Sequence, residues 1–112
     1  MKTPLPGRRV RGSQTGRPIM ALLDLLGRRW SLRVLWELHR GPQTFRRLRT
    51  SCDEMSPSVL NLRLSELRKA GIVEHTDEGY ALTSRGRDLL RAFKPLNDWS
   101  KRWNRRSTMA AR

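Results

Sequence analysis

One stretch decides the fold of this chain: SPSVLNLRLSELRKAG, residues 56–71. Ser56 is a favourable N-cap residue, and Pro57 suits the first helical position because its φ is already helical and no N–H is needed there. Leucines recur at helical spacing at positions 60, 64 and 67, which gives one apolar face. Gly71 follows two basic residues of the last turn and suits a left-handed cap. The stretch therefore predicts a well-capped helix with one buried face.

The opposite face of this helix carries Ser58, Leu62, Ser65 and Lys69, and the single leucine is unusual on a solvated surface. A helix fits the major groove of DNA, which is about 12 Å wide. Short side chains let the backbone approach the groove floor, and the free N–H groups of the first turn can meet a phosphate. We therefore expect this helix to contact base edges, through Ser56, Ser58, Val59, Asn61, Leu62 and Arg63.

The side-chain types suggest individual roles in such a groove. Asn61 can pair with adenine, and Arg63 can pair with guanine or contact a phosphate. Leu62 or Val59 can touch the methyl group of thymine.

A shorter helix is predicted before this one, from Thr44 or Phe45 to Cys52, followed by a tight turn at residues 53–55. Its outer face carries three arginines and no acid, a pattern that favours phosphate contacts over a merely solvated face. These phosphate candidates are Arg46, Arg47 and Arg49. Two helices joined by a tight turn, the second presenting small polar side chains, form a helix-turn-helix.

A β-hairpin is predicted directly after the capped helix, with strands at 72–76 and 80–82 around a turn at 77–79. A hairpin in this place is the feature of a winged helix-turn-helix, so the expected fold is mainly α with a small β-hairpin. The tip carries Asp77 and Glu78, which would repel phosphate. The expected phosphate contacts near the hairpin are therefore Lys69, His75 and Thr76.

Two helices are expected before the helix-turn-helix. The first begins at Pro18 and ends at Gly27, for which we expect a left-handed cap. The second is capped by Ser31 and runs to about Arg40, where Gly41 and a proline stop it. Its predicted apolar stripe consists of Leu32, Leu35, Trp36 and His39, with Val34 and Leu38 beside it.

A final helix is expected after Thr83, kinked or restarted at Pro95. The first and last helices have more apolar side chains than one small core can cover, which suggests that a second copy of the chain covers them. The expected dimer contacts are Ile19, Met20, Leu23, Leu25, Leu96, Trp99 and Trp103.

Length and charge agree with a nucleic-acid partner. The 112 residues suffice for one domain, and the formal net charge is +14. Residues 1–17 and 99–112 each hold five basic residues and no acidic one, and such segments gain affinity for polyanions by displacing counterions. We expect a disordered basic arm at 1–17, a folded domain at 18–104 and a basic tail at 105–112. No apolar run approaches the roughly 18 residues of a membrane span, and no signal peptide is present, so we expect a cytoplasmic protein without membrane contact.

The sequence resembles the HxlR-type winged helix-turn-helix regulators of bacteria. The resemblance covers about residues 18–103. Its segments are GRRW at 27–30 with LRVLWEL at 32–38, Gly41 with FRRL at 45–48, SPSVLNLRLSEL at 56–67 with GIV at 71–73, YALTSRG at 80–86, and Trp99. It implies a cytoplasmic homodimer, paired through its first and last helices, that binds a pseudo-palindromic operator and usually represses. Some members of the family sense oxidants or electrophiles with a cysteine before the first helix, where this chain has Arg17 and Pro18.

Other chemistries find little support in the sequence. Cys52, the only cysteine, is either a buried structural thiol or a redox or electrophile sensor. Neither histidine has a second ligand at metal spacing, and no catalytic set of residues emerges, so we expect no cofactor, no metal and no enzyme activity. Two alternatives to a sequence-specific regulator remain: a non-specific nucleic-acid binder that uses its basic ends, and a winged-helix protein-interaction module. A small-molecule effector is not indicated by the sequence.

Overall fold

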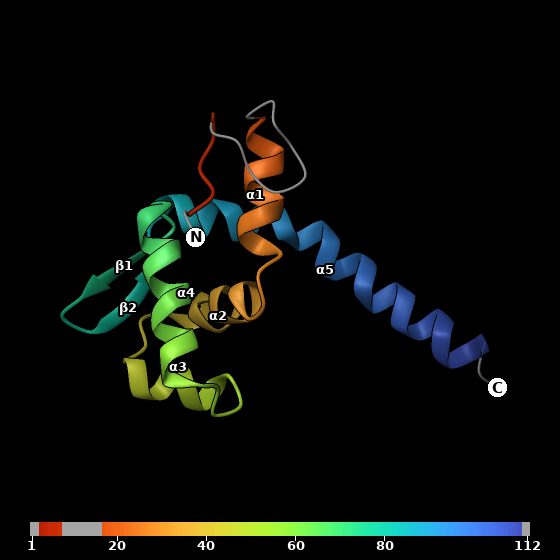
Figure 1. Cartoon of the computed structure of the whole chain (residues 1–112). Helices are drawn as coiled ribbons and strands as arrows, with labels where there is room; N and C mark the ends of the chain where they lie inside the picture. Colours follow the sequence, from red (N-terminus) through yellow and green to blue (C-terminus); the bar gives the residue numbers. More distant parts are fainter. Residues whose placement is uncertain (1–2, 8–16, 111–112) are drawn as a thin grey trace.

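The computed structural model describes residues 3–7 and 17–110, and the side chains of the last helix as far as residue 105. These described residues form five α-helices, one short 3-10 helix and one antiparallel hairpin, and Figure 1 shows their arrangement. In order they are α1 (Pro18–Leu26), α2 (Ser31–Glu37), η1 (Leu38–Arg40), α3 (Phe45–Ser51), α4 (Pro57–Lys69), β1 (Val73–Thr76), β2 (Gly79–Leu82) and α5 (Ser84–Ala110). This order confirms the winged helix-turn-helix. Most of the expected basic arm, and the end of the expected tail, lie outside the described residues.

The core lies where α2, α3 and α4 meet, under the hairpin. Leucines supply most of it, and α4 presents three of them as one stripe. The large apolar side chains with almost no exposure are Val34, Leu35, Leu38, Leu48, Cys52, Leu60, Leu64 and Leu67. The predicted leucine face of the 56–71 helix is thus confirmed as buried, which leaves the opposite face of α4 outward.

The hairpin pairs Val73 with Leu82 and Thr76 with Gly79. A third segment extends the pairing, because the backbones of Gln43 and Tyr80 exchange two hydrogen bonds of 2.9 and 2.8 Å. Gly79 has a φ of +116°, and a Cβ there would lie 2.8 Å from the backbone nitrogen of Thr44. The hairpin is therefore fixed to the segment that precedes α3, and glycine is required for that close approach.

The connection between α1 and α2 differs from the prediction. Gly27 has an ordinary helical φ of −76°, and the left-handed conformation occurs instead at Trp30, with φ +77°. Ser31 is the first residue of α2 rather than its cap, and its hydroxyl is buried without a hydrogen-bond partner among the described residues. Leu32, Trp36 and His39 are exposed, so these three predicted core positions are wrong, whereas Leu35 is buried as expected.

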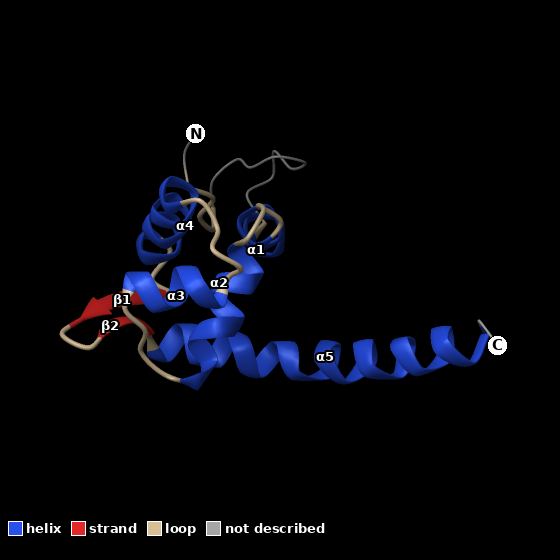
Figure 2. Cartoon of the chain, turned by 90° about the horizontal axis from the view of Figure 1, so that it is seen from below, coloured by secondary structure: helices blue, strands red, loops and turns tan. Residues whose placement is uncertain are grey.

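Helix α5 is the longest element, and it runs without interruption through Pro95, contrary to the expected break. Its first half packs on the domain, and its second half extends away from the other elements, as both views show (Figures 1 and 2). No helix among the described residues is long and apolar enough to span a membrane.

Candidate nucleic-acid interface

The outward face of α4 begins at its capped N-terminus. The Ser56 hydroxyl accepts a hydrogen bond from the Val59 N–H at 3.5 Å and lies 3.0 Å from the Ser58 hydroxyl. Ser56, Ser58 and Asn61 are exposed, and Leu62 is 52% exposed. Val59 is half-buried against the core. The structure thus brings together five of the six expected base-contacting residues at one end of α4.

The sixth, Arg63, is placed differently. Its Nε donates a hydrogen bond of 2.7 Å to the backbone oxygen of Arg29. Its Nη1 donates a second hydrogen bond, also of 2.7 Å, to Glu66 Oε1. Burial, with the charge of Arg28 nearby, lowers the pKa of Arg63. The guanidinium is therefore committed to the protein interior side of α4, and this conformation does not offer it to a base pair.

Arg63 belongs to a cluster of four charged side chains that joins α4 to the end of α1. Glu66, only 5% exposed, accepts hydrogen bonds from both Arg28 and Arg63. Arg28 also lies 3.6 Å from Asp24. Two cations and two anions balance each other, as groups this buried must. We call Asp24, Arg28, Arg63 and Glu66 the charge cluster.

Sequence reasoning missed the charge cluster because Arg28 and Glu66 are 38 residues apart. The available signal was local: Arg63 and Glu66 have the i,i+3 spacing of a helical ion pair. The cluster fixes the rotation of α4, since it ties the flank of the helix to the connection between α1 and α2.

The basic face of α3 is only partly free. Arg46 and Arg47 are exposed and line an open groove with Arg40 and Gln43. Arg49 instead bends back: its Nε donates to the Met55 backbone oxygen at 2.7 Å, and it pairs with Glu54 at 3.3 Å. This arginine therefore holds the turn between α3 and α4.

That turn is left-handed at two successive residues, with φ +58° at Asp53 and +56° at Glu54. Such conformations are costly for residues other than glycine, and the surrounding bonds must maintain them. The Arg49 contacts supply part of that restraint.

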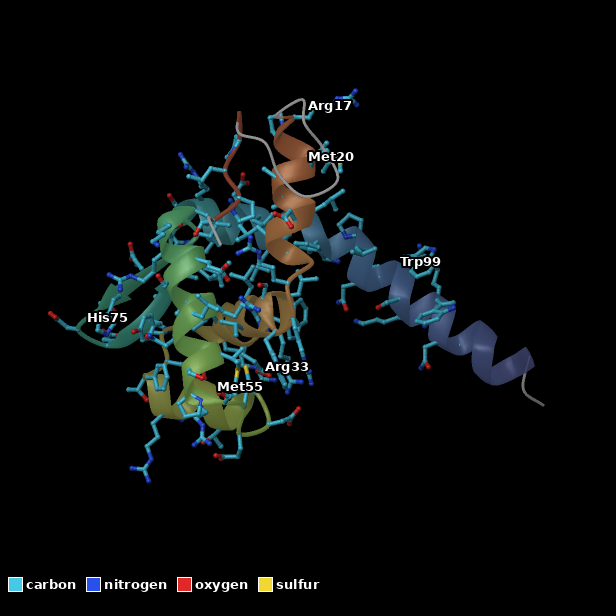
Figure 3. All side chains as sticks on the ribbon, in the orientation of Figure 1. Arg17, Met20, Arg33, Met55, His75 and Trp99 are labelled. Carbon is cyan, nitrogen blue, oxygen red and sulfur yellow. The ribbon has the colours of Figure 1, made fainter. Side chains whose placement is uncertain are left out.

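The hairpin carries two stacked aromatic rings and three exposed acidic side chains, Glu74 among them. His75 is exposed on β1 of the hairpin (Figure 3) and stacks on Tyr80 with ring centroids 4.4 Å apart. Thr76 is half-buried, and its hydroxyl donates to the Gly79 backbone oxygen at 2.8 Å, so it closes the turn. Asp77, Glu78 and, at the end of α4, Lys69 are exposed.

Comparison with known proteins identifies this arrangement. The model of the HxlR-like helix-turn-helix family matches residues 25–108. The chain belongs to the HxlR-like helix-turn-helix family. It is therefore a DNA-binding helix-turn-helix transcriptional regulator, in a family of regulators rather than enzymes.

Relatives and solved structures agree with the family. The uncharacterized HTH-type transcriptional regulator sll1512 of Synechocystis is 33% identical over 93 residues, which cover 73% of this chain and 69% of the relative. Quinone-bound YodB of Bacillus subtilis is a similar structure, with a TM-score of 0.70 and 30% identity over 75% of this chain and 96% of YodB. A possible HxlR family transcriptional factor from Thermoplasma volcanium has a TM-score of 0.67 and 28% identity over 75% of this chain and 82% of that structure.

The single thiol of this HxlR-like regulator lies inside the core. Cys52 is fully buried, and burial raises its pKa to about 11. Because the thiolate is the reactive form, these surroundings favour the structural interpretation of Cys52 over the sensor. No group of metal-ligating side chains is present in the described part of the chain.

The apolar surplus of the first and last helices is visible in the structure. Each of five expected dimer contacts is more than half exposed: Ile19, Leu23, Leu96, Trp99 and Trp103. The two tryptophan rings stack at 5.7 Å on the extended half of α5, where Figure 3 places Trp99. Met20 is partly exposed. Leu25 was wrongly expected on this surface: it is 3% exposed and packs in the core of the same chain.

Proposed function

We propose that this HxlR-like regulator binds a pseudo-palindromic operator as a homodimer, in the cytoplasm, and represses transcription. One observation carries the sequence-specific part: α4 presents an outward surface of Ser58, Asn61 and Leu62 while its inner face is locked by leucines and the charge cluster. A rigid helix with short side chains can enter the major groove in one orientation, which base recognition requires.

Direct contacts with bases are assigned to the exposed half of α4. Asn61 is suited to two hydrogen bonds with adenine, and Leu62 to a thymine methyl. Ser56 and Ser58 flank the helix N-terminus, whose free N–H groups favour a phosphate. Val59 is half-buried and supports the contact from below. Arg63 acts through its bonds to Glu66 and Arg29, which position the helix.

Contacts with phosphates are assigned to exposed arginine, lysine and histidine side chains on either side of α4. Arg46 and Arg47 project from α3, and Lys69 and His75 lie at the other end of α4 and on the hairpin. Arg49 and Thr76 contribute by holding the turns that present their neighbours. The acidic hairpin tip disfavours deep insertion beside phosphates, so the α3 side supplies most of the charge.

Homodimerisation is assigned to the apolar surfaces of α1 and α5. Monomeric proteins rarely expose a contiguous apolar stripe with two tryptophans, and a second copy of the chain would cover it. A two-fold axis through α5 would present two α4 helices to half-sites about 34 Å apart, one DNA turn. A dimer on an operator would then exclude other proteins from that DNA, which is the basis for proposing repression.

Selection of bound duplexes from a random pool tests this function. We expect an inverted repeat, with Asn61→Ala reducing the preference for one base pair in each half-site by about 1–3 kcal/mol. Arg46→Gln is the matched control, because loss of a phosphate contact should weaken all sequences alike. Equal effects of the two changes on every sequence would refute the assignment of base readout to α4.

Non-specific nucleic-acid binding by the basic ends is a second candidate, favoured by five basic residues and no acid in each of 1–17 and 99–112. It predicts that removing residues 1–17 and 104–112 abolishes binding to every duplex, whereas Asn61→Ala changes nothing. A preferred inverted repeat that survives the truncation would exclude it as the main function. The remaining alternative is a protein-interaction module, and it predicts that neither the full-length nor the truncated chain prefers any duplex.

A further inference from the structure

A cavity of about 540 Å³ lies between α1, α5 and the C-terminal end of α4, on the side of α1 away from Ile19 and Leu23. Residues 4–6 form another part of its wall, and Figure 1 shows this first segment beside α1 and the end of α4. The volume is within the range of roughly 300–1,000 Å³ that is usual for small-molecule sites.

Two helical stripes make the cavity apolar. Ala21, Leu22 and Leu25 line it from α1, and Leu89 and Ala92 line it from α5. Ala21, Leu22 and Leu25 are related by i+3 and i+4, and Leu89 and Ala92 by i+3, so each helix turns one face toward the space. The walls of such a cavity accept the hydrocarbon part of a ligand.

The cavity also has an excess of positive charge at its rim. Lys69, Arg85 and Asp88 line it. Asp88 is paired with Arg91 at 3.3 Å, whereas Lys69 and Arg85 form no ion pair with any side chain in the described part of the chain. Two cations without a carboxylate partner, beside apolar walls, complement a molecule with one anionic end.

We propose that this cavity binds a small organic anion with an aromatic or branched apolar body, its carboxylate or sulfonate held by Lys69 and Arg85. Lys69 is the last residue of α4, and Ala70 and Ile72 after it also line the cavity. A ligand there therefore contacts the end of the helix to which base reading is assigned. Occupancy of the cavity does not itself depend on that function, and its first test contains no DNA.

The probe for the test is 1-anilinonaphthalene-8-sulfonate, compared with the uncharged N-phenyl-1-naphthylamine, which keeps the rings and lacks the sulfonate. We expect saturable fluorescence with one site per chain. Lys69→Gln with Arg85→Gln should weaken the sulfonate dye by about tenfold or more and leave the uncharged dye unchanged. The matched control is Arg68→Gln with Lys101→Gln, which removes the same charge from exposed positions outside the cavity. An equal loss in the control would overturn the site.

Location is tested by filling the space. Ala92→Phe, at an exposed helical position on the rim, should weaken both dyes, and methyl NMR signals of Leu22 and Leu89 should shift on titration. Shifts confined to Ile19 and Leu96 would show that the dye covers the outer apolar surface and would overturn the proposal. The proposal would also be overturned if neither dye bound at protein concentrations where the chain is dimeric, because a partner copy would then fill the cavity. If the chain still prefers an inverted repeat while the dye results overturn the cavity site, the proposed regulatory function is unaffected.

Discussion

Replacing Glu66 by glutamine should destabilise the fold far more than an ordinary surface change. The side chains of Glu66, Arg28 and Arg63 are 7%, 11% and 15% exposed, so all three charges are largely removed from water. Glu66→Gln keeps the shape but leaves both guanidiniums without their shared carboxylate. Breaking a buried ion pair costs about 3–5 kcal/mol. Asp24 remains 3.6 Å from Arg28 and offsets part of the loss, so we expect about 3 kcal/mol, the lower end of that range.

Urea unfolding at one fixed protein concentration measures this loss. With a slope of about 1.5 kcal/mol per molar urea, typical for a small domain, the midpoint should fall by about 2 M. Glu37→Gln is the matched control, because Glu37 pairs with Arg33 across a partly exposed i,i+4 contact of 3.3 Å. Such pairs contribute only about 0.3–0.5 kcal/mol. If Glu66→Gln shifts the midpoint no more than Glu37→Gln does, the charge cluster does not stabilise α4 and the reasoning fails.

Three further outcomes are expected. Burial raises the pKa of Cys52 to about 11, so the folded chain holds the thiol proton more tightly than the unfolded chain does. The neutral thiol therefore stabilises the fold at neutral pH. This stabilisation is lost as the pH rises from the ordinary thiol pKa of about 8.5 toward 11. The stability difference between the natural chain and Cys52→Ala should therefore shrink over that window, and a constant difference would contradict the shift. Gly79→Ala should destabilise the fold by at least about 1 kcal/mol more than Gly41→Ala in thermal unfolding. Both glycines have a positive φ, but only a Cβ at Gly79 would meet the Gln43 backbone. Equal melting temperatures of the two variants would show that Gly79 does not lie close to that backbone. Leu48→Ala should lower the free energy of unfolding by about 2–5 kcal/mol because the Leu48 side chain is fully buried. Leu62→Ala should lower it by less than about 0.5 kcal/mol because Leu62 is exposed. Similar losses for the two variants in urea unfolding would mean that Leu62 is covered.

Elements with strong local signals could be predicted from the sequence. The serine cap, proline and leucine spacing of α4 act within the helix itself, as does the Thr44 cap of α3, whose hydroxyl accepts a bond from the Arg47 N–H at 3.2 Å. The hairpin follows from a turn sequence between two short apolar runs. These features depend on neighbours within a few residues, so the chain specifies them locally.

Features that depend on distant partners could not be predicted. Val34 of α2 and Leu38 of η1 face the core while Trp36 faces outward, and no periodicity within residues 31–40 distinguishes this rotation from the predicted one. Pro95 was expected to interrupt the last helix, yet the helix continues through it.

The candidate site divides in the same way. The exposure of Asn61 and Leu62 follows from the leucine face opposite them. The bond from Arg63 to the backbone oxygen of Arg29 joins residues 34 positions apart, and the bond from Arg49 to the Met55 oxygen depends on the left-handed turn between α3 and α4. A basic residue on a helix surface is thus a poor guide to a DNA contact until its intramolecular bonds are known.

The outward face of α4 has one consequence for how the regulator would respond to its surroundings. The outward side chains of its N-terminal half, Ser58, Asn61 and Leu62, carry no charge, while the exposed cations Arg46 and Arg47 stand on α3. Contacts with phosphates weaken as ionic strength rises, whereas uncharged contacts with bases hardly change. A rise in cellular potassium would then loosen the regulator from every stretch of chromosome by the same factor and leave its ranking of those stretches intact.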